Sequence, residues 1–525
     1  MQPEDPSPSC GHASGLAITE ASGFAPTATT RRALITGGSG FLGFRLGTAL
    51  AKDGIQVFLL DLAPPRQSLP PNTTFIRGSV ANAADVDAAF STAAAAAASS
   101  ATSSSSTGCC GGFLDAVFHV ASYGMSGREL RDLARITAVN VGGTQHVLDA
   151  CVRYGVPRLV YVSTCNVIFV GKPISCGTEA APYPPPAAYK DAYSATKAAA
   201  ERLVLAANGS RNSSSLSGRA GGDGSGGGAE HGEAGAGKSS WSRRQAAVGA
   251  RPEQEQPPQP PHVLYTCAVR STGIWGPGET RHQPRVIRMV RAGLFGATFG
   301  DLSSLSDWIH VDNLVQLLAR AERALRHHTA GPDGNNSTAA GAAGGGAAAP
   351  PVAAGQVYYA SDGAPINNFL HFKPFIVGLG YRYPSLNVPY WLVYGIAALI
   401  EYVWPVLQYI VADPPLTRME VDKCCVSHWF DISKARRELG YRPVSYDRGE
   451  VVSYMRAEGW GNPAVGKAGV ATLHGRSGLM LGGGTFGPAR VRGRVTVLGL
   501  LVAVLVGLAV AYGGRLGGQL GVSGW

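Results

Sequence analysis

The sequence predicts an α/β protein built on a doubly wound parallel sheet, with a smaller C-terminal lobe and a C-terminal transmembrane helix. Two observations predict the sheet. Short apolar strand patterns alternate with helix patterns along the chain, as parallel strands joined by crossover helices require. A glycine-rich turn also separates the first strand from the first helix, at the edge where such sheets bind their ligands.

The first unit reads ALITGGSGFLGFRLGTALAKDG, and IQVFLLD follows as the second strand. Gly37 permits the tight turn, Gly40 lets the backbone approach a pyrophosphate, and Gly43 allows close helix–strand packing. The helix N-terminus then faces the anion. Asp61 ends the second strand, where a carboxylate hydrogen-bonds the adenosine 2′-hydroxyl and repels a 2′-phosphate. The pattern predicts a Rossmann site for NAD, with NADP less favoured, although the nearby Arg66 acts against that preference.

Four further strands continue the alternation of strand and helix. The helix VNVGGTQHVLDACVRYG precedes the fifth strand. His119, on the fourth strand, is interpreted as a packed strand residue rather than a catalyst. The third to sixth strands are expected at NTTFIRG (72–78), DAVFHVAS (115–122), PRLVYVST (157–164) and HVLYTCAVR (262–270).

The stretch DAYSATKAAAER places Tyr193 four residues before Lys197 in a helical pattern, so both side chains share one helix face. An ammonium beside a phenol favours the phenolate, so Lys197 is expected to lower the pKa of Tyr193 and make it a proton acceptor. The same spacing also arises by chance, and its meaning depends on context. Ser163 and Thr164 supply that context, because they end the fifth strand at the ligand-binding edge.

Composition divides the chain into one folded domain and several segments without the apolar periodicity that folding requires. The folded domain is expected over residues 31–441, after a disordered leader at 1–30. Residues 442–494 are interpreted as a linker and 513–525 as a tail. Flexible insertions rich in alanine, serine, glycine or proline are expected at 91–112, 208–260 and 330–355.

The uncharged run from Val495 to Tyr512 predicts the transmembrane helix, since it would span about 27 Å at 1.5 Å per residue. Three arginines directly precede the run, which places that side in the cytoplasm. Residues 388–411 are also apolar and aromatic, but Glu401 and Pro405 interrupt them. This segment is expected to lie at the bilayer surface, with a spanning helix or a buried helix of the substrate lobe as alternatives.

The net charge of +10 does not indicate nucleic-acid binding, because six basic residues and no acidic ones follow Glu458, around the transmembrane run. The nine cysteines contain no C-x-x-C metal pair, and no metal site is expected. Cys109–Cys110 and Cys424–Cys425 are adjacent pairs, which are not expected to form bridges. The cysteine pattern suggests a reducing compartment.

Several ordered motifs together resemble the extended short-chain dehydrogenases/reductases: TGGSGFLG, FHVAS, VNVGGTQHVLDAC, VYVST, YSATK, GIWGPGE and WIHVDNLV. The stretches ASYGMSGREL, NVIFVG, GIWGPGETRHQPR and SDGAPINNF resemble the 3β-hydroxysteroid dehydrogenase/isomerase-like branch, specifically short-chain dehydrogenase/reductase family 42E. The resemblance runs from about Arg32 to about Tyr441 and is interrupted by the three insertions.

The resemblance implies a role for each residue of the site. Tyr193 is then the catalytic acid/base, and Lys197 lowers its pKa and holds the nicotinamide ribose hydroxyls. Thr164 hydrogen-bonds the substrate oxygen, with Ser163 as the alternative. The implied activity is NAD-dependent oxidation of the 3β-hydroxyl of a steroid or sterol to a ketone. An NADPH-dependent reductase of another lipid or phenolic ketone, or a non-enzymatic NAD-binding regulator, are the alternatives.

Two positions depart from the family pattern: Ser79 stands where many relatives have an aspartate that contacts adenine, and Ser271 stands where proline is common. His310 and Asp312 suggest a second acid/base pair, but Asp312 is interpreted as a helix N-cap. The expected partners are a steroid-like molecule and a membrane, with homodimerisation left open. The expected location is the endoplasmic reticulum membrane, with the catalytic domain facing the cytoplasm.

Overall fold

The computed structural model describes residues 31–99, 114–125, 129, 131–211, 262–326, 349–407 and 416–463. The predicted leader, most of each insertion and the run from Val495 to Tyr512 lie outside these residues. Among the helices that the structure describes, none has the length and apolar content needed to cross a membrane.

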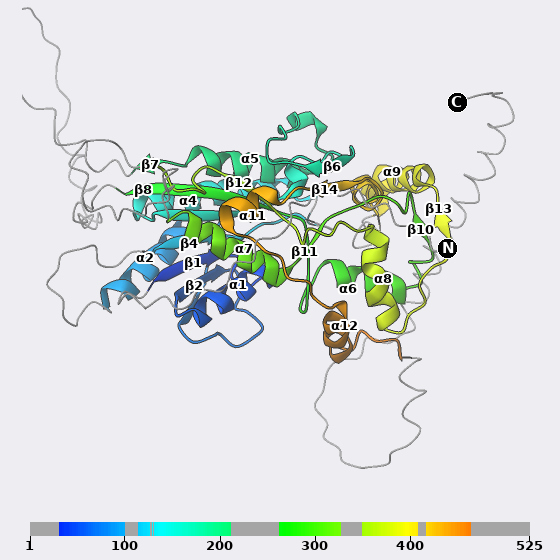
Figure 1. The fold of residues 1–525 in the computed structure, drawn as a ribbon, viewed down its shortest axis with the longest axis horizontal. Helices are drawn as coiled ribbons and strands as arrows, with labels where there is room; N and C mark the ends of the chain where they lie inside the picture. Colours follow the sequence, from blue (N-terminus) through cyan, green and yellow to red (C-terminus); the bar gives the residue numbers. More distant parts are fainter. Residues whose placement is uncertain are drawn as a thin grey trace, which may run out of the picture.

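Within the described residues the central sheet has eight strands, and seven of them run parallel in the order β12-β8-β5-β4-β1-β2-β3 (Figure 1). β7 (Ser210–Arg211) pairs antiparallel with β8 at the edge of the sequence insertion. This is the predicted Rossmann-type sheet, with the strand order reversing beside β1. The parallel strands are β1 (Arg32–Thr36), β2 (Gln56–Asp61), β3 (Thr73–Arg77), β4 (Ala116–His119), β5 (Arg158–Thr164), β8 (Val263–Ser271) and β12 (Val357–Ala360).

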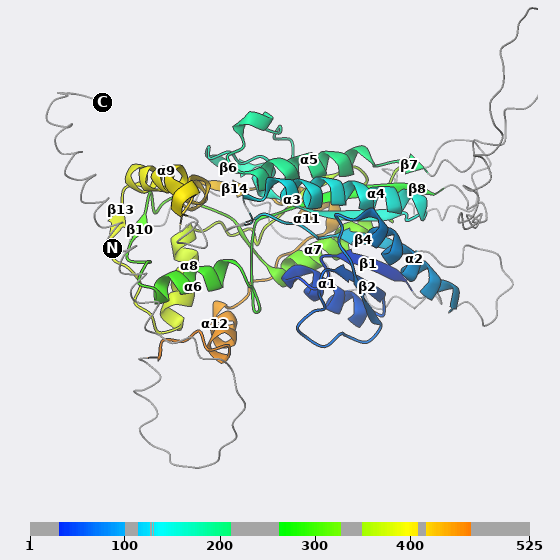
Figure 2. The same cartoon turned by 180° about the vertical axis from the view of Figure 1, so that it is seen from behind.

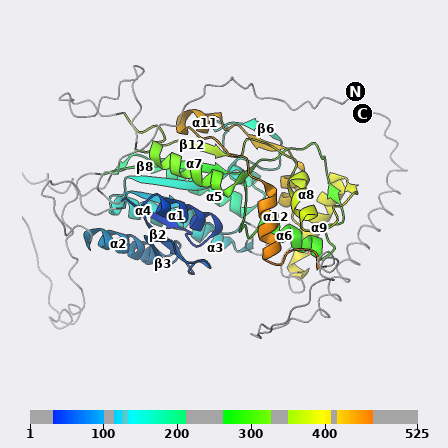
Figure 3. The same cartoon turned by 60° about the horizontal axis from the view of Figure 1, so that its bottom comes forward.

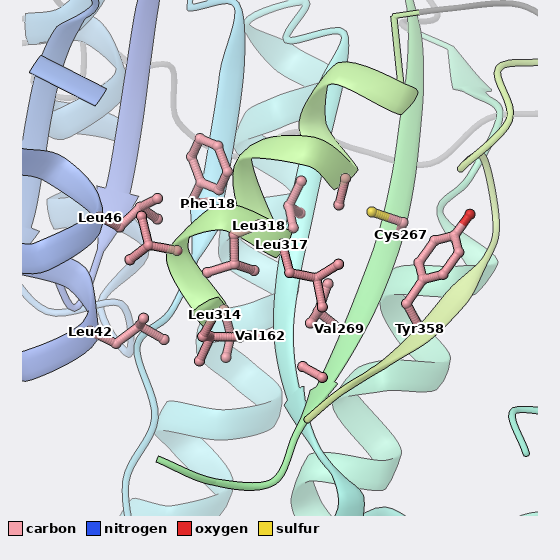
Figure 4. Close-up of a cluster of buried hydrophobic side chains, with 14 of the residues drawn as sticks. Leu42, Leu46, Phe118, Val162, Cys267, Val269, Leu314, Leu317, Leu318 and Tyr358 are labelled. Atoms are coloured by element: carbon pink, nitrogen blue, oxygen red, sulfur yellow. The ribbon is translucent and has the colours of Figure 1, made fainter. Parts of the chain in front are cut away.

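Helices cover both faces of this sheet because alternate strand residues point to opposite sides. α1 (Phe41–Lys52) and α7 (Val311–Ala324) lie side by side on one face, as Figure 3 shows. There, leucines of both helices pack on apolar side chains of the strands (Figure 4). The opposite face is covered by α2 (Ala83–Ser99), α4 (Gly143–Arg153) and α5 (Ala192–Ala206).

All six predicted strands are present, and two features of the sheet and its helices differ from the sequence-based expectation. Residues 91–99, assigned to a flexible insertion, instead complete α2, because their alanines favour a helix. β12 was not predicted, since its four residues follow directly on a glycine- and alanine-rich stretch. It extends the sheet beyond β8, with Val357 beside Ala268.

The predicted second lobe lies beside the sheet, at one end of the molecule (Figures 1 and 2). Its apolar core joins the chain after β8 to segments from the C-terminal part. The helices of the lobe are α6 (His282–Arg291), α8 (Asn368–Gly378), α9 (Tyr390–Leu407), α10 (Arg418–Cys425) and α12 (Arg448–Ala457). Three two-stranded sheets complete the connections between lobe and sheet: β10 (Thr298–Phe299) with β13 (Asn387–Val388), β11 (Trp308–His310) with β9 (Gly273–Trp275), and β14 (His428–Phe430) with β6 (Ile174–Gly177).

The interpretation of residues 442–494 as a linker is wrong for the part that the structure describes. α12 lies in this range, and Val451, Val452 and Met455 are buried in the core of the lobe. Their spacing places them on one helix face, which packs beside α8. The folded domain therefore extends past Tyr441, at least to residue 463.

His310 and Asp312 have structural roles, as interpreted, but the N-cap is His310 rather than Asp312. The His310 side chain accepts from the Asp312 backbone N–H, and α7 begins at Val311. Asp312 instead forms a two-point ion pair with Arg45 of α1, at 2.6 and 2.8 Å. The pair joins the two helices that share one face of the sheet. Cys424 and Cys425 are both free, as expected.

Candidate active site

The glycine turn after β1 is tightly packed. Gly37 has a φ of +68°, and its backbone N–H donates to the Leu60 carbonyl at 2.8 Å. A Cβ atom at Gly43 would lie 2.2 Å from the Gly37 carbonyl oxygen, which leaves room only for glycine. The turn therefore brings the start of α1 close to the end of β1, and Gly40, at the start of the helix, is exposed.

Asp61 lies at the end of β2, where its carboxylate accepts from the backbone N–H groups of Ser39 and Leu62, at 2.9 and 2.7 Å. These contacts fix the carboxylate beside the glycine turn. The Ser39 hydroxyl is buried and finds no hydrogen-bond partner in the described part of the chain. Gly40, the N-cap of α1, provides no side-chain cap either. An orphaned hydroxyl and an uncapped helix start suit a dinucleotide pyrophosphate.

Tyr193 and Lys197 lie on α5, as predicted, and both are buried, with 5% and 2% of their surfaces exposed. The helix begins after Asp191, whose side chain caps the Ser194 backbone N–H at 2.7 Å. This N-cap fixes the first turn, which carries Tyr193. Tyr193 interacts with Ser122, which follows β4, and with Cys165, which follows β5. The phenol therefore lies at the carboxyl edge of the sheet.

The largest influences on the pKa of Tyr193 do not include Lys197, so the expected lowering by Lys197 stays a prediction. Burial raises the pKa of Tyr193 to about 12, and the positive charge that lowers it most is that of Arg281. A hydrogen bond with Ser122 lowers the pKa further, while Asp191 raises it. Tyr193 is thus protonated at neutral pH and set to donate a proton.

The Lys197 ammonium points toward β5. It donates to the Val162 carbonyl at 2.6 Å and lies 4.1 Å from the centre of the Tyr161 ring. Burial lowers the pKa of Lys197 to about 7, and Glu201 acts in the opposite direction. One lone carbonyl satisfies only part of the hydrogen-bonding capacity of an ammonium, which can donate three bonds. Lys197 can therefore also donate to a ligand at this edge.

Ser163 and Thr164 end β5 beside α5, and both are buried. The Thr164 hydroxyl accepts from the Asn166 backbone N–H at 3.3 Å and keeps its own proton for donation. The Ser163 hydroxyl has no hydrogen-bond partner among the described residues. Either group can donate to a substrate oxygen, so both alternatives for this role stay open.

Three residues of the site were not singled out from the sequence: Ser122, Asn140 and Arg281. Asn140 lies in a π-helical turn, η2 (Ala138–Gly142). Its side-chain oxygen accepts from the Tyr123 backbone N–H and its side-chain nitrogen donates to the Tyr123 carbonyl, each at 2.9 Å. It thereby fixes the segment that carries Ser122. Ser122 ends the motif FHVAS and Asn140 lies within VNVGG, whereas Arg281 approaches Tyr193 only through the tertiary fold.

The same segment links the glycine turn to the tyrosine. A Cβ atom at Gly37 would lie 2.9 Å from the Cα of Ala121, and the next residue is Ser122. The dinucleotide turn and the Tyr193 phenol therefore meet at one edge of the sheet. His119, just before this segment, is buried between Thr36 and Thr144 at 2.7 and 2.9 Å, as a packed strand residue. Burial lowers the pKa of His119 to about 3, so it is neutral.

The two departures from the family pattern lie outside this proton-transfer set. The Ser79 backbone N–H donates to the Asp85 carboxylate at 2.8 Å, in the first turn of α2. The Ser271 hydroxyl, at the end of β8, donates to the Thr272 carbonyl at 3.0 Å.

The sequence model of the 3-beta hydroxysteroid dehydrogenase/isomerase family matches residues 34–219 and 258–389, which include every residue of this site. The chain belongs to that family. The mouse short-chain dehydrogenase/reductase family 42E member 1 is 38% identical over 435 residues, which cover 83% of this chain and 89% of the mouse protein. The resemblance stated from the motifs is thereby confirmed, and the chain is an oxidoreductase of the short-chain dehydrogenase/reductase type.

A plant protein is a more distant relative. The Arabidopsis thaliana 3beta-hydroxysteroid-dehydrogenase/decarboxylase isoform 1 is 31% identical over 423 residues, or 80% of this chain and 77% of the plant protein. Among solved structures, the epimerase Mth375 of Methanothermobacter thermautotrophicus has a TM-score of 0.50 and 17% identity, covering 82% of this chain and 92% of the epimerase. This likeness shows the shared Rossmann-type fold alone.

Proposed function

We propose that the protein oxidises the 3β-hydroxyl of a steroid or sterol to a ketone with NAD⁺. The observation that carries the proposal is the meeting of the glycine turn and Tyr193 at one sheet edge, joined through Ala121 and Ser122. Membership of the family and the 3β-hydroxysteroid named for the plant relative support the substrate class.

Different residues of the chain would bind the cofactor and transfer the proton. NAD⁺, when bound, supplies the two-electron acceptor. The turn from Gly37 to Gly43 and the α1 start would hold its pyrophosphate, and Asp61 its adenosine ribose. Lys197 would donate to the nicotinamide ribose. The ionised fraction of Tyr193 accepts the proton of the substrate alcohol, and the protonated form returns it in the reverse reduction. Thr164 or Ser163 donates to the same substrate oxygen and fixes its direction.

A panel experiment tests the substrate class. Detergent-solubilised protein is incubated with NAD⁺ and matched 3β- and 3α-hydroxysteroids, sterols, and secondary alcohols without a steroid skeleton. Ketones are then identified by mass spectrometry. We expect ketones from 3β-alcohols in preference to their 3α epimers. Turnover confined to non-steroid alcohols would reject the steroid proposal, although the proton-transfer site would stand.

We expect the enzyme to prefer NAD⁺ over NADP⁺ by about tenfold or more in kcat/KM, because the Asp61 carboxylate would face a 2′-phosphate of like charge. Arg66, which could attract that phosphate, is exposed in the loop after β2. Asp61→Ala should lower the ratio of kcat/KM with NAD⁺ to kcat/KM with NADP⁺, and Arg66→Ala should raise that ratio. Steady-state kinetics with both cofactors measures this. A preference of the wild type for NADP⁺ would favour the alternative of an NADPH-dependent reductase.

We also propose that α9 seats the enzyme on a lipid surface. One face of this helix is buried in the lobe, through Val393, Ala397 and Trp404. The other face exposes large side chains, above all Trp391 and Tyr402, which are 69% and 83% exposed. Exposed aromatic side chains on a mostly apolar helix are typical of segments that lie in the membrane interface. This supports a membrane-soluble substrate.

A chain that ends near Pro488 lacks the run from Val495 to Tyr512, and we expect it to keep its activity in detergent and still bind vesicles. In that truncated chain, Trp391→Ser with Tyr402→Ser should weaken vesicle binding by roughly tenfold or more, since each buried aromatic contributes about 1.5–3 kcal/mol. Tyr454→Ser, an exposed aromatic on α12, is the matched control. Co-sedimentation with vesicles measures binding. A truncated chain that stays fully in the supernatant would refute the role of α9.

A further inference from the structure

A buried set of charges extends from Lys197 along α5. Glu201 lies one turn after Lys197 on the same helix face and is fully buried. Its carboxylate accepts from the Arg270 guanidinium at 2.7 Å and from the Tyr183 hydroxyl at 2.6 Å. Arg270, on β8, is only 2% exposed and also donates to the Tyr359 hydroxyl at 3.0 Å. Glu201 thus pairs directly with Arg270 and lies one helical turn from the buried Lys197.

This arrangement has an electrostatic consequence for Lys197. Burial disfavours the ammonium, and Glu201 is the charge that stabilises it, so the pKa of Lys197 remains at about 7. The other groups that face Lys197 are the neutral ring of Tyr161 on β5 and His119 on β4, which is uncharged at neutral pH. Without the Glu201 charge, Lys197 and Arg270 would be two buried cations with no carboxylate between them.

We propose that Glu201, anchored by Arg270 and Tyr183, is a positioning residue for the reaction: its charge, one helical turn away, keeps the Lys197 ammonium protonated at the end of β5. The inference rests on the proposed function, because it takes Lys197 as the group that donates to the nicotinamide ribose. A purely structural role for Glu201, neutralising Arg270 alone, would affect stability but not the protonation of Lys197. The two roles therefore differ in their dependence on pH.

The test measures NAD⁺ affinity against pH by calorimetry, with the full chain in detergent. Wild-type affinity should fall as the pH rises through the titration of Lys197. Glu201→Gln should move the midpoint of that fall down by about one pH unit or more, the usual effect of a close opposite charge. Arg270→Met removes the competing cation and should move the midpoint up. Opposite shifts in the two variants support the proposal.

Glu322 offers a matched control. It is also buried between two arginines, Arg158 at the start of β5 and Arg326, at 2.8 and 2.6 Å. Glu322→Gln should lower Tm and leave the midpoint unchanged. Glu201→Asp, which keeps the charge, should hold the midpoint near that of the wild type even if Tm falls.

A midpoint in Glu201→Gln equal to that of the wild type, or wild-type affinity that does not change with pH, overturns the role of Glu201 while NAD⁺ binding stands. A wild type that binds no NAD⁺ overturns the proposed function as well. If Glu201→Gln does not fold, Arg270→Met decides alone, and an unchanged or lowered midpoint in that variant overturns the proposal.

Discussion

Tyr193→Phe is expected to lower the turnover of a secondary alcohol by roughly 10²-fold or more, the usual scale of general acid–base catalysis. The change removes one oxygen atom from a side chain that is almost fully buried. The ring still fills its place at the start of α5, so Tm and NAD⁺ affinity should remain near their wild-type values. Absorbance of the reduced cofactor measures turnover, and circular dichroism measures Tm.

The pH dependence of the same variant is a second test. Because burial raises the pKa of Tyr193 to about 12, only a small fraction is ionised at neutral pH. Below that pKa the ionised fraction of Tyr193 rises with pH. At saturating NAD⁺, where cofactor binding favours the ammonium form of Lys197, wild-type oxidation should therefore accelerate as the medium becomes alkaline, and ketone reduction should not. Tyr193→Phe should lack this rise. Tyr189→Phe, which loses a hydroxyl bonded to the Val167 carbonyl at 2.6 Å, is the control. If the Tyr193→Phe variant turned over substrate at the rate of the wild type, Tyr193 and Lys197 would share a helix face by coincidence.

Lys197→Ala is expected to impair both NAD⁺ binding and turnover. A hydrogen bond from a charged donor contributes about 1.5–3 kcal/mol, so the Kd for NAD⁺ should rise about 10- to 100-fold. Turnover at saturating NAD⁺ should fall further, because the ammonium that fixes the ribose beside Tyr193 is lost. Calorimetry and steady-state kinetics separate the two effects.

Lys197→Arg should retain part of the activity, since it keeps a charge but changes the donor geometry. Lys190→Met is the control. Lys190 is a lysine just before α5 that pairs with Asp422 of the lobe and not with the cofactor site. Its NAD⁺ affinity should match that of the wild type. A Lys197→Ala variant with unchanged affinity for NAD⁺ would remove Lys197 from the cofactor site.

The sequence predicts most of the sheet because most of its strands are short apolar runs between helix patterns, and because the glycine spacing is typical of a turn between strand and helix. Gly37, Gly43 and Asp61 take the expected places, since their roles depend on neighbours close in the chain. β12 and α12 escaped prediction for a physical reason. Each is short, and each is buried only by partners that are distant in sequence.

The features of the site that could be predicted likewise depend on residues close in the chain, and those that could not be predicted depend on the tertiary fold. The shared helix face of Tyr193 and Lys197 is local geometry and could be predicted. The direction of the Lys197 ammonium, toward the Val162 carbonyl, depends on how α5 packs against β5. The influence of Arg281 on Tyr193 likewise depends on the approach of α6 to the sheet. Neither contact leaves a pattern in the sequence.

One measurement tests the central claim most directly: incubation of the wild-type protein and NAD⁺ with a 3β-hydroxysteroid that carries deuterium at C3. The proposed reaction predicts a 3-ketone that has lost the deuterium, formed in equal amount with the reduced cofactor and more slowly than from the unlabelled steroid. Tyr193→Phe should form roughly 10²-fold less ketone, or lower still, in the same time. A wild type that forms no ketone, or a product that keeps its deuterium at C3, would contradict the account.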